Sequence, residues 1–301
     1  MRIGIPVGGF HEGNTGEYVL RALTALGHEC SILNHDELLQ ATSNHRFDLY
    51  FGVDSGETLR VAELPSDALR RYAFWFIDYR HNKNRSTRMP TDEENARLIA
   101  AGGGWIFQAQ FQDVEDCAAH SIHRASWLPM AADEAIWQPR AGQKQFDVAF
   151  IGNVWDEGRL QALRGIQESG LKFAALCNGA VWKERAASAL CSAKIGFNIS
   201  SWYGTEFAFD LNMRFFEVLS CGLPIVTNAV PALGRLFREQ PPFVRVYSCA
   251  EEIVPTLTRA LSDPVFLGSG ELAREYIIGA GTYRHRMIDA LETLRKNLHV
   301  G

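Results

Sequence analysis

The sequence predicts an α/β protein made of two domains, each built on a parallel sheet with helices on both faces. Two observations support this prediction. Short apolar runs alternate with amphipathic helical stretches from one end of the 301-residue chain to the other, as in repeated β-α-β units. The alternation stops once, at the polar stretch 137–145, which contains Pro139 and Gly142 and is typical of a linker. We therefore expect one domain over residues 1–138 and a second over residues 139–301.

The first predicted domain opens with an apolar strand over residues 2–7 and a glycine-containing loop over residues 8–13. Asn14 and Glu17 then form a capping-box pattern that starts a helix, and Gly27 ends it. The remaining predicted elements are strands over 28–33, 47–53, 72–77, 105–108 and 126–130, and a helix that Thr91 and Glu94 cap and the glycines at 102–104 end. Strands separated by helices pair in parallel, so a parallel sheet is expected.

The second predicted domain repeats this pattern after the linker. Its predicted strands cover residues 146–151, 172–176, 194–199, 224–227 and 244–247; its helices begin at Asp156 or cover 182–190 and 212–220, and two more follow the last strand. The final helix, near residues 282–298, carries apolar side chains at helical spacing: Met287, Ile288, Leu291, Leu294 and Leu298. We expect this C-terminal helix to pack back along that apolar face.

Two such series predict two Rossmann-like domains. In doubly wound sheets, ligands bind beyond the carboxyl ends of the strands. We expect the two domains to face each other, which makes the cleft between them the expected binding site.

Composition excludes several classes of protein. The formal net charge is −5, which argues against a general affinity for nucleic-acid phosphates. The six cysteines are scattered and form no C-x-x-C pair, which favours buried, reduced thiols. The chain shows no signal-peptide pattern and no run of about 20 apolar residues. We therefore expect a cytoplasmic protein without a transmembrane segment.

The most informative segment covers residues 212–228. It places Arg214 and Glu217 on neighbouring positions of one helix face, with Gly222 ending the helix before a new strand. A carboxylate can accept two hydrogen bonds from a vicinal diol such as a nucleotide ribose, and an arginine at a helix start suits a diphosphate. An intrahelical ion pair on a solvated face explains the same spacing, and the spacing alone leaves both interpretations open.

The segment 212–228, Asn-x-Arg-x-x-Glu followed by Cys-Gly-Leu-Pro and a Val-Thr strand, resembles the nucleotide-sugar motif of GT-B glycosyltransferases, above all the spore-maturation CgeB-like branch. Other segments resemble that family in the expected order: 127–133 with Pro139, 146–153 with Arg159, 194–199, and 281–286, where Gly281 replaces the first histidine of the family's His-Thr-Tyr-x-x-Arg stretch. The resemblance covers roughly residues 125–290, while the N-terminal half matches mainly in architecture.

The resemblance implies a GT-B fold and a glycosyltransferase of the hexosyltransferase type. Such an enzyme moves a sugar from a nucleoside diphosphate donor, UDP above all, to an acceptor hydroxyl. It needs neither a metal nor another cofactor, and it retains the anomeric configuration. The domain at 139–301 would bind the nucleotide-sugar, and the domain at 1–138 would face the acceptor.

Site residues carry over from the family position by position. Glu217 would bind the donor ribose, and Arg214 and Arg159 would face the diphosphate. The other implied donor-binding residues are Gly152 and Asn153, which allow the diphosphate to approach closely, and Asn198, Asn212, Thr227 and Asn228. Many retaining members have a second glutamate eight residues before the ribose-binding one; here that position is Phe209, between Glu206 and Asp210. This departure leaves the donor sugar and the stereochemical course open.

In the first domain, polar residues follow the apolar strand at 72–77. Asp78 or His81 could orient or deprotonate an acceptor hydroxyl, although a turn-forming aspartate and a surface histidine explain them as well. Gly9 and His11 lie in the loop after the first strand, where they could contact a phosphate or the acceptor; an ordinary loop is the alternative. The loop lacks the G-x-G-x-x-G spacing, which disfavours a dinucleotide cofactor.

No metal site is predicted, because His120 and His123 lack a third ligand nearby in the sequence. Arg159, Arg214 and helix N-termini would instead neutralise the departing diphosphate. Two alternatives stay open: a nucleotide-sugar epimerase, and a binding or regulatory protein that has lost catalysis, which Phe209 keeps under consideration. The sequence specifies neither the acceptor nor the oligomeric state.

Overall fold

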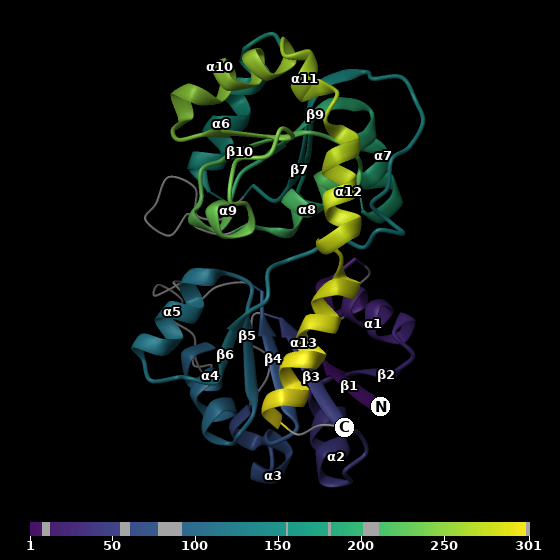
Figure 1. Ribbon diagram of the computed structural model, residues 1–301, viewed down its shortest axis with the longest axis vertical. Helices are drawn as coiled ribbons and strands as arrows, with labels where there is room; N and C mark the ends of the chain where they lie inside the picture. The colour runs from purple at the N-terminus through teal and green to yellow at the C-terminus, as the bar shows by residue number, and fades with distance from the viewer. Residues whose placement is uncertain are drawn as a thin grey trace. The chain divides into compact units, whose positions relative to one another are not determined.

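The computed structural model describes residues 1–7, 13–54, 61–77, 92–154, 156–179, 182–200 and 211–298 (Figure 1). The chain divides into two compact units: a first unit, Met1–Pro129 with Tyr283–Gly301, and a second unit, Met130–Thr282. Within the described residues, each unit contains one parallel sheet with helices packed on it. The predicted pair of Rossmann-like α/β domains is therefore confirmed. The domain boundary between residues 138 and 139 stays a prediction.

The first unit is built on a sheet with the strand order β2-β1-β3-β4-β5-β6. Its strands are β1 (Arg2–Pro6), β2 (Glu29–Leu33), β3 (Leu49–Asp54), β4 (Tyr72–Phe76), β5 (Trp105–Gln108) and β6 (Ala125–Trp127). Its helices are α1 (Thr15–Ala25), α2 (His35–Ser43), α3 (Ser66–Leu69), α4 (Asp92–Ala101), α5 (Phe111–Ala119) and α13 (Tyr283–Leu298), with a 3-10 turn at Val61–Glu63. The strands lie close to their predicted positions, whereas α2, α3 and α5 were not predicted.

Local capping explains where α1 begins and ends. The Asn14 side chain accepts a hydrogen bond from the Glu17 amide at 3.0 Å. The Glu17 carboxylate accepts one from the Gly13 amide at 2.7 Å, one residue earlier than a capping box requires. Gly27 has φ +83°, a left-handed conformation that costs glycine little. The predicted start and end of this helix are confirmed.

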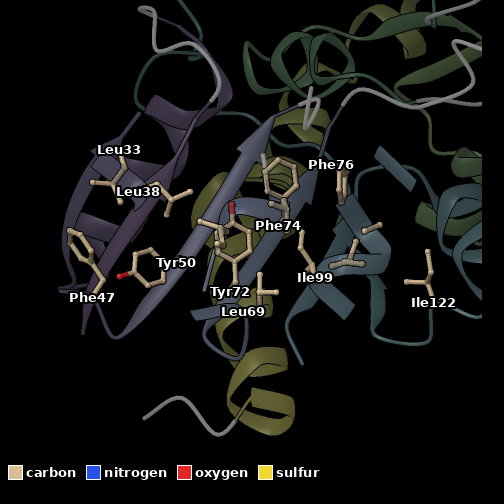
Figure 2. Close-up of a cluster of buried hydrophobic side chains, with 14 of the residues drawn as sticks. Leu33, Leu38, Phe47, Tyr50, Leu69, Tyr72, Phe74, Phe76, Ile99 and Ile122 are labelled. Atoms are coloured by element: carbon tan, nitrogen blue, oxygen red, sulfur yellow. The ribbon is translucent and has the colours of Figure 1, made fainter. Parts of the chain in front are cut away.

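An aromatic row fills the core of the first unit (Figure 2). The rings of Tyr50 and Tyr72 stack with centroids 6.4 Å apart, and Tyr72 and Phe74 stack at 6.5 Å. All five residues of β4 are buried, because helices cover this central strand on both sides. Gly52 in β3 leaves room for the neighbouring ring, since an alanine Cβ there would lie 2.8 Å from Cε2 of Phe74.

Replacing Gly52 by alanine is expected to lower the free energy of unfolding by about 1–3 kcal/mol, because the added methyl group overpacks a rigid aromatic row. Urea unfolding of wild type and variant would measure the difference. Gly142→Ala is the matched control, since nothing lies within 4 Å of its added Cβ. Equal stability of the two variants would contradict this account of the core.

The second unit is built on a sheet with the strand order β11-β10-β9-β7-β8. Its strands are β7 (Phe146–Gly152), β8 (Phe173–Cys177), β9 (Ala193–Asn198), β10 (Ile225–Asn228) and β11 (Val244–Tyr247). Its helices are α6 (Glu157–Glu168), α7 (Lys183–Cys191), α8 (Met213–Ser220), α9 (Pro231–Leu236), α10 (Ala250–Leu261), α11 (Pro264–Leu267) and α12 (Gly270–Ala280). Two helices were predicted after β11, and this was wrong: α10, α11, α12 and α13 follow it. Three short breaks, at Asp263, Gly268 and Gly281, divide the C-terminal region into these four helices.

The last helix, α13, belongs to the first unit, where it packs against α1. The Tyr283 ring lies 5.1 Å from Tyr18 and 6.1 Å from Trp75, measured between centroids. Met287, Leu291 and Leu294 are fully or almost fully buried, so the predicted apolar face packs back onto the sheet domain. None of the described helices is both long enough and apolar enough to cross a membrane.

Candidate functional site

The strand order of the second unit creates a reversal point beside β7. The chain runs from β7 to β8 on one side of it, and then to β9 on the other side. Loops after these strands separate at this point, and doubly wound sheets bind their ligands at the carboxyl ends there. Gly152 ends β7 and Asn198 ends β9. The candidate site therefore lies at the carboxyl edge of β7 and β9.

Arg159 joins the two sides of this reversal point. It lies in the first turn of α6, where Asp156 caps the helix, and it is only 4% exposed. One guanidinium nitrogen donates to the Asn153 carbonyl at 2.7 Å and another to the Ile199 carbonyl at 3.1 Å. Arg159 Nε also lies 3.7 Å from the Asp156 carboxylate. Arg159 therefore fixes both loops and places a guanidinium, ion-paired with Asp156, between them.

A buried polar network holds the chain that leaves β9. The Asn198 side chain donates to Thr227 Oγ1 at 3.1 Å. Asn228 accepts from the Ser200 amide at 2.8 Å and donates to Ser200 Oγ at 2.7 Å. All four residues are at most 3% exposed. The predicted site residues Asn198, Thr227 and Asn228 thus lie together, and they position the backbone. Ser200 was not predicted as a site residue, although it directly follows the strand predicted over residues 194–199.

The N-terminal half of α8 contains the predicted pair, a half-buried Arg214 and a buried Glu217. An Arg214 guanidinium nitrogen donates to Glu217 Oε2. Glu217 is 1% exposed, so the ion pair exists but does not lie on a solvated face. Glu217 Oε1 is buried and finds no hydrogen-bond partner in the described part of the chain.

Asn212 precedes α8 at its N-cap position. Its side-chain amide donates to the Ile199 carbonyl at 2.9 Å, which brings it to the same carbonyl that Arg159 contacts. Its Oδ1 is buried, again without a hydrogen-bond partner among the residues described. Since buried acceptors without partners are costly, this oxygen and Glu217 Oε1 are available to a ligand that donates hydrogen bonds.

Burial sets the protonation of Glu217. Loss of solvent raises the pKa of its carboxyl from 4.5 to about 7, and the neighbouring Arg214 lowers the pKa but does not offset the burial. The ionised carboxylate is therefore less stable in the fold than in water. A ligand that donates hydrogen bonds to Oε1 would stabilise the ionised form.

The raised pKa of Glu217 predicts a pH-dependent stability. A carboxyl whose folded pKa is raised binds more protons in the folded state, so its contribution to stability falls as pH rises from about 4.5 to 7. We expect the free energy of unfolding of Glu217→Gln, relative to that of wild type, to rise by up to a few kcal/mol between pH 4.5 and 7. Above pH 7 this difference should stay constant. Urea unfolding of both proteins at pH 5, 6, 7 and 8 measures the difference. Parallel curves would contradict the raised pKa.

The other predicted site residues are placed as follows. Gly152 and Asn153 lie at the end of β7, and Asn153 is exposed. Asp78, His81, Gly9 and His11 lie outside the described residues, as does Phe209. Among the residues that the structure describes, no three His, Cys, Asp or Glu side chains cluster as metal ligands would. His120 interacts with Asp116 of its own helix through an Nδ1–carbonyl distance of 2.9 Å.

Trp137 was missed by the sequence analysis, which placed it in the linker. It is 1% exposed, and the Arg214 guanidinium lies 5.5 Å from its ring centroid. Its carbonyl accepts a hydrogen bond from Ser220 Oγ at the end of α8. A tryptophan is rarely left in solvent, which was the one sequence signal that this position belongs to a packed site.

Comparisons with known proteins agree with this architecture. A family model described as glycosyl transferase-like matches residues 133–292. The fold is similar to sucrose-phosphate synthase from Thermosynechococcus elongatus (11% identity, 100% of both chains, TM-score 0.71) and to AviGT4, a glycosyltransferase involved in avilamycin A biosynthesis (13%, 100% and 98%, TM-score 0.67). It is also similar to an α-glucosyltransferase in complex with UDP and a 13-mer DNA containing an HMU base (11%, 98% and 99%, TM-score 0.64). No curated protein matches the sequence.

Proposed function

The chain belongs to the glycosyl transferase-like family, and on this basis we propose that it moves a sugar from a nucleoside diphosphate donor to an acceptor hydroxyl. It is a glycosyltransferase with the GT-B fold. The observation that best supports the nucleotide donor is the buried Glu217, one of whose carboxylate oxygens is paired with Arg214 while the other has no partner in the described part. This oxygen would accept hydrogen bonds from the ribose diol.

The departing diphosphate would develop negative charge near the reversal point beside β7. Two arginines lie there to meet this charge: Arg159, which is fixed between the two loops beside Asp156, and Arg214, which is paired with Glu217 and 20% exposed. The first amides of α6 and α8 add partial positive charge. We propose that this preorganised set neutralises the leaving group without a metal ion.

UDP is the first donor nucleotide to test, because the similar α-glucosyltransferase was solved in complex with UDP. The donor motif and the segment 281–286 support assignment to the CgeB-like branch, and with it retention of configuration. Asp78, His81, Gly9 and His11 remain proposed acceptor-side residues. In this scheme Asp78 or His81 orients or deprotonates the acceptor hydroxyl.

Thermal unfolding with UDP, GDP, dTDP, CDP and ADP, each with and without EDTA, would test the donor proposal. A nucleotide at 100 times its dissociation constant stabilises by about 2.7 kcal/mol, which is a shift of several degrees. We expect one nucleotide to give this shift in melting temperature, and EDTA to leave the shift unchanged. In a separate transfer assay, the sugar nucleotide of the same base should donate its sugar to an acceptor. Absence of any shift would contradict the donor site. Nucleotide binding without sugar transfer to any acceptor would favour a regulatory protein. Chemical alteration of the free sugar nucleotide, with no acceptor present, would favour an epimerase.

A further inference from the structure

We infer that Trp137 is a positioning residue of the donor site, which holds Arg214 against Glu217 so that one carboxylate oxygen stays available to the ribose. The inference rests on the proposed function. It adds Trp137 to the donor site as a residue that touches neither the nucleotide nor the sugar and acts through Arg214. All residues involved lie in the second unit. Three observations support it: how Trp137 is anchored, what its ring faces, and how a similar set in the same unit differs.

The backbone of Trp137 is anchored on two sides. The Trp137 amide donates to the Asp133 carbonyl at 2.9 Å, which closes the turn that leads into it. Its carbonyl accepts from Ser220 Oγ, and an Arg274 guanidinium nitrogen lies 3.4 Å from that carbonyl and donates to the Ser220 carbonyl at 2.6 Å. Trp137 is thereby fixed to the end of α8, the helix that carries Glu217. The backbone of Trp137 therefore moves with this helix, and its indole ring is held in place by burial.

The Trp137 ring faces the Arg214 guanidinium at 5.5 Å from the ring centroid. A guanidinium over an indole ring is attracted by the ring's negative face, and this attraction is strongest where water is excluded. Trp137 is 1% and Glu217 1% exposed, so Arg214 lies between a buried ring and a buried carboxylate. Without the ring, the long arginine side chain would gain freedom to turn towards solvent, and Glu217 would lose its partner.

A second arginine–ring–carboxylate set in the same unit shows what is special about the first. The Arg245 guanidinium lies 4.8 Å from the Phe266 ring centroid and donates to Asp263 Oδ2 at 2.9 Å. The other oxygen, Asp263 Oδ1, accepts from the amides of Val265 and Phe266 at 3.0 and 3.1 Å. Both carboxylate oxygens are used within the protein, as in a structural cap. In the Trp137 set, Glu217 Oε1 is buried and lacks a partner in the part of the chain described.

Three variants test this inference: Trp137→Leu, Trp137→Phe and Phe266→Leu. The ¹³C chemical shift of the labelled Glu217 carboxyl, followed through a pH titration, reports the pairing with Arg214 directly, because Arg214 lowers the pKa of that carboxyl. We expect Trp137→Leu to raise this pKa by at least half a unit and to weaken UDP binding about tenfold in calorimetry. Trp137→Phe keeps a ring and should retain most of the pairing. Phe266→Leu should lower the melting temperature but change neither the Glu217 pKa nor the affinity for UDP.

An unchanged Glu217 pKa in Trp137→Leu would overturn the inference, even if the variant were less stable. If Trp137→Leu does not fold, Trp137→Phe decides: the weaker attraction of a phenyl ring should raise the pKa by a smaller but measurable amount, and no rise would overturn the inference. The proposed function fails separately. If wild type binds none of the five nucleotides, the donor proposal is wrong, while the titration still shows whether Trp137 holds Arg214 on Glu217.

Discussion

Replacing Glu217 by glutamine is expected to weaken nucleoside diphosphate binding by about 100-fold or more. A charge-assisted hydrogen bond contributes about 1.5–3 kcal/mol, and the ribose diol would make two of them. Glutamine keeps the shape of the side chain but removes the negative charge, and it also removes the partner of Arg214. Calorimetric titration with the nucleotide that stabilises wild type measures the loss, and kcat/KM for the sugar nucleotide should fall in parallel.

Asp263→Asn is the control for the glutamine variant. Asp263 also pairs with an arginine over an aromatic ring, but its oxygens are already used by Arg245 and by the amides at the start of α11. This variant should lose some stability through the lost cap, by about 0.5–2 kcal/mol, and bind the nucleotide as wild type does. Equal affinities of Glu217→Gln and wild type would exclude Glu217 as a ribose ligand.

The positions of the strands could be predicted from the sequence because local signals mark them. Stretches of four to seven mainly apolar residues coincide with β1, β4, β7 and β11, and Asn14 with Gly27 delimits α1. The helix α2 was missed although Asn34 and Glu37 form a complete capping box at its start. The helix has few apolar positions, so its sequence shows no clear helical period. The four-residue helices α3 and α11 are too short to produce a period at all.

Sequence spacing could predict a contact within the site only between residues that lie close together in the chain, whereas the distant residues Arg159, Asn198 and Asn228 followed from the family resemblance. Arg214 and Glu217 are three residues apart, so their pairing could be read from helical spacing. Trp137 meets Ser220 across 83 residues and Arg274 across 137, and Arg159 meets Ile199 across 40. Such contacts depend on how the strands are ordered in the sheet. For the same reason, the spacing could not show that the Arg214–Glu217 pair is buried, which is what raises the Glu217 pKa.

Replacing Arg159 by methionine is expected to lower both stability and activity strongly. The change removes the side chain that joins the two loops at the reversal point: the Asn153 carbonyl loses this donor, and the Ile199 carbonyl keeps the Asn212 side-chain amide. A lost partner of a buried polar group costs about 1–3 kcal/mol. We therefore expect a loss of about 2–4 kcal/mol in the free energy of unfolding. The Arg159→Met substitution also removes one of the two positive charges proposed to face the diphosphate. We therefore expect kcat/KM to fall at least 100-fold.

Two further variants separate the roles of Arg159. Arg159→Lys keeps the charge but reaches at most one of the two carbonyls well, because a lysine lacks the planar fork of an arginine. Arg164→Met, on an exposed position of the same helix α6, is the matched control and should change neither stability nor turnover. If Arg159→Lys recovers turnover but little stability, the charge is what catalysis requires. If it recovers neither stability nor turnover although the charge is kept, the placement of both loops is what matters. Wild-type turnover in Arg159→Met would show that the leaving group is neutralised without this arginine.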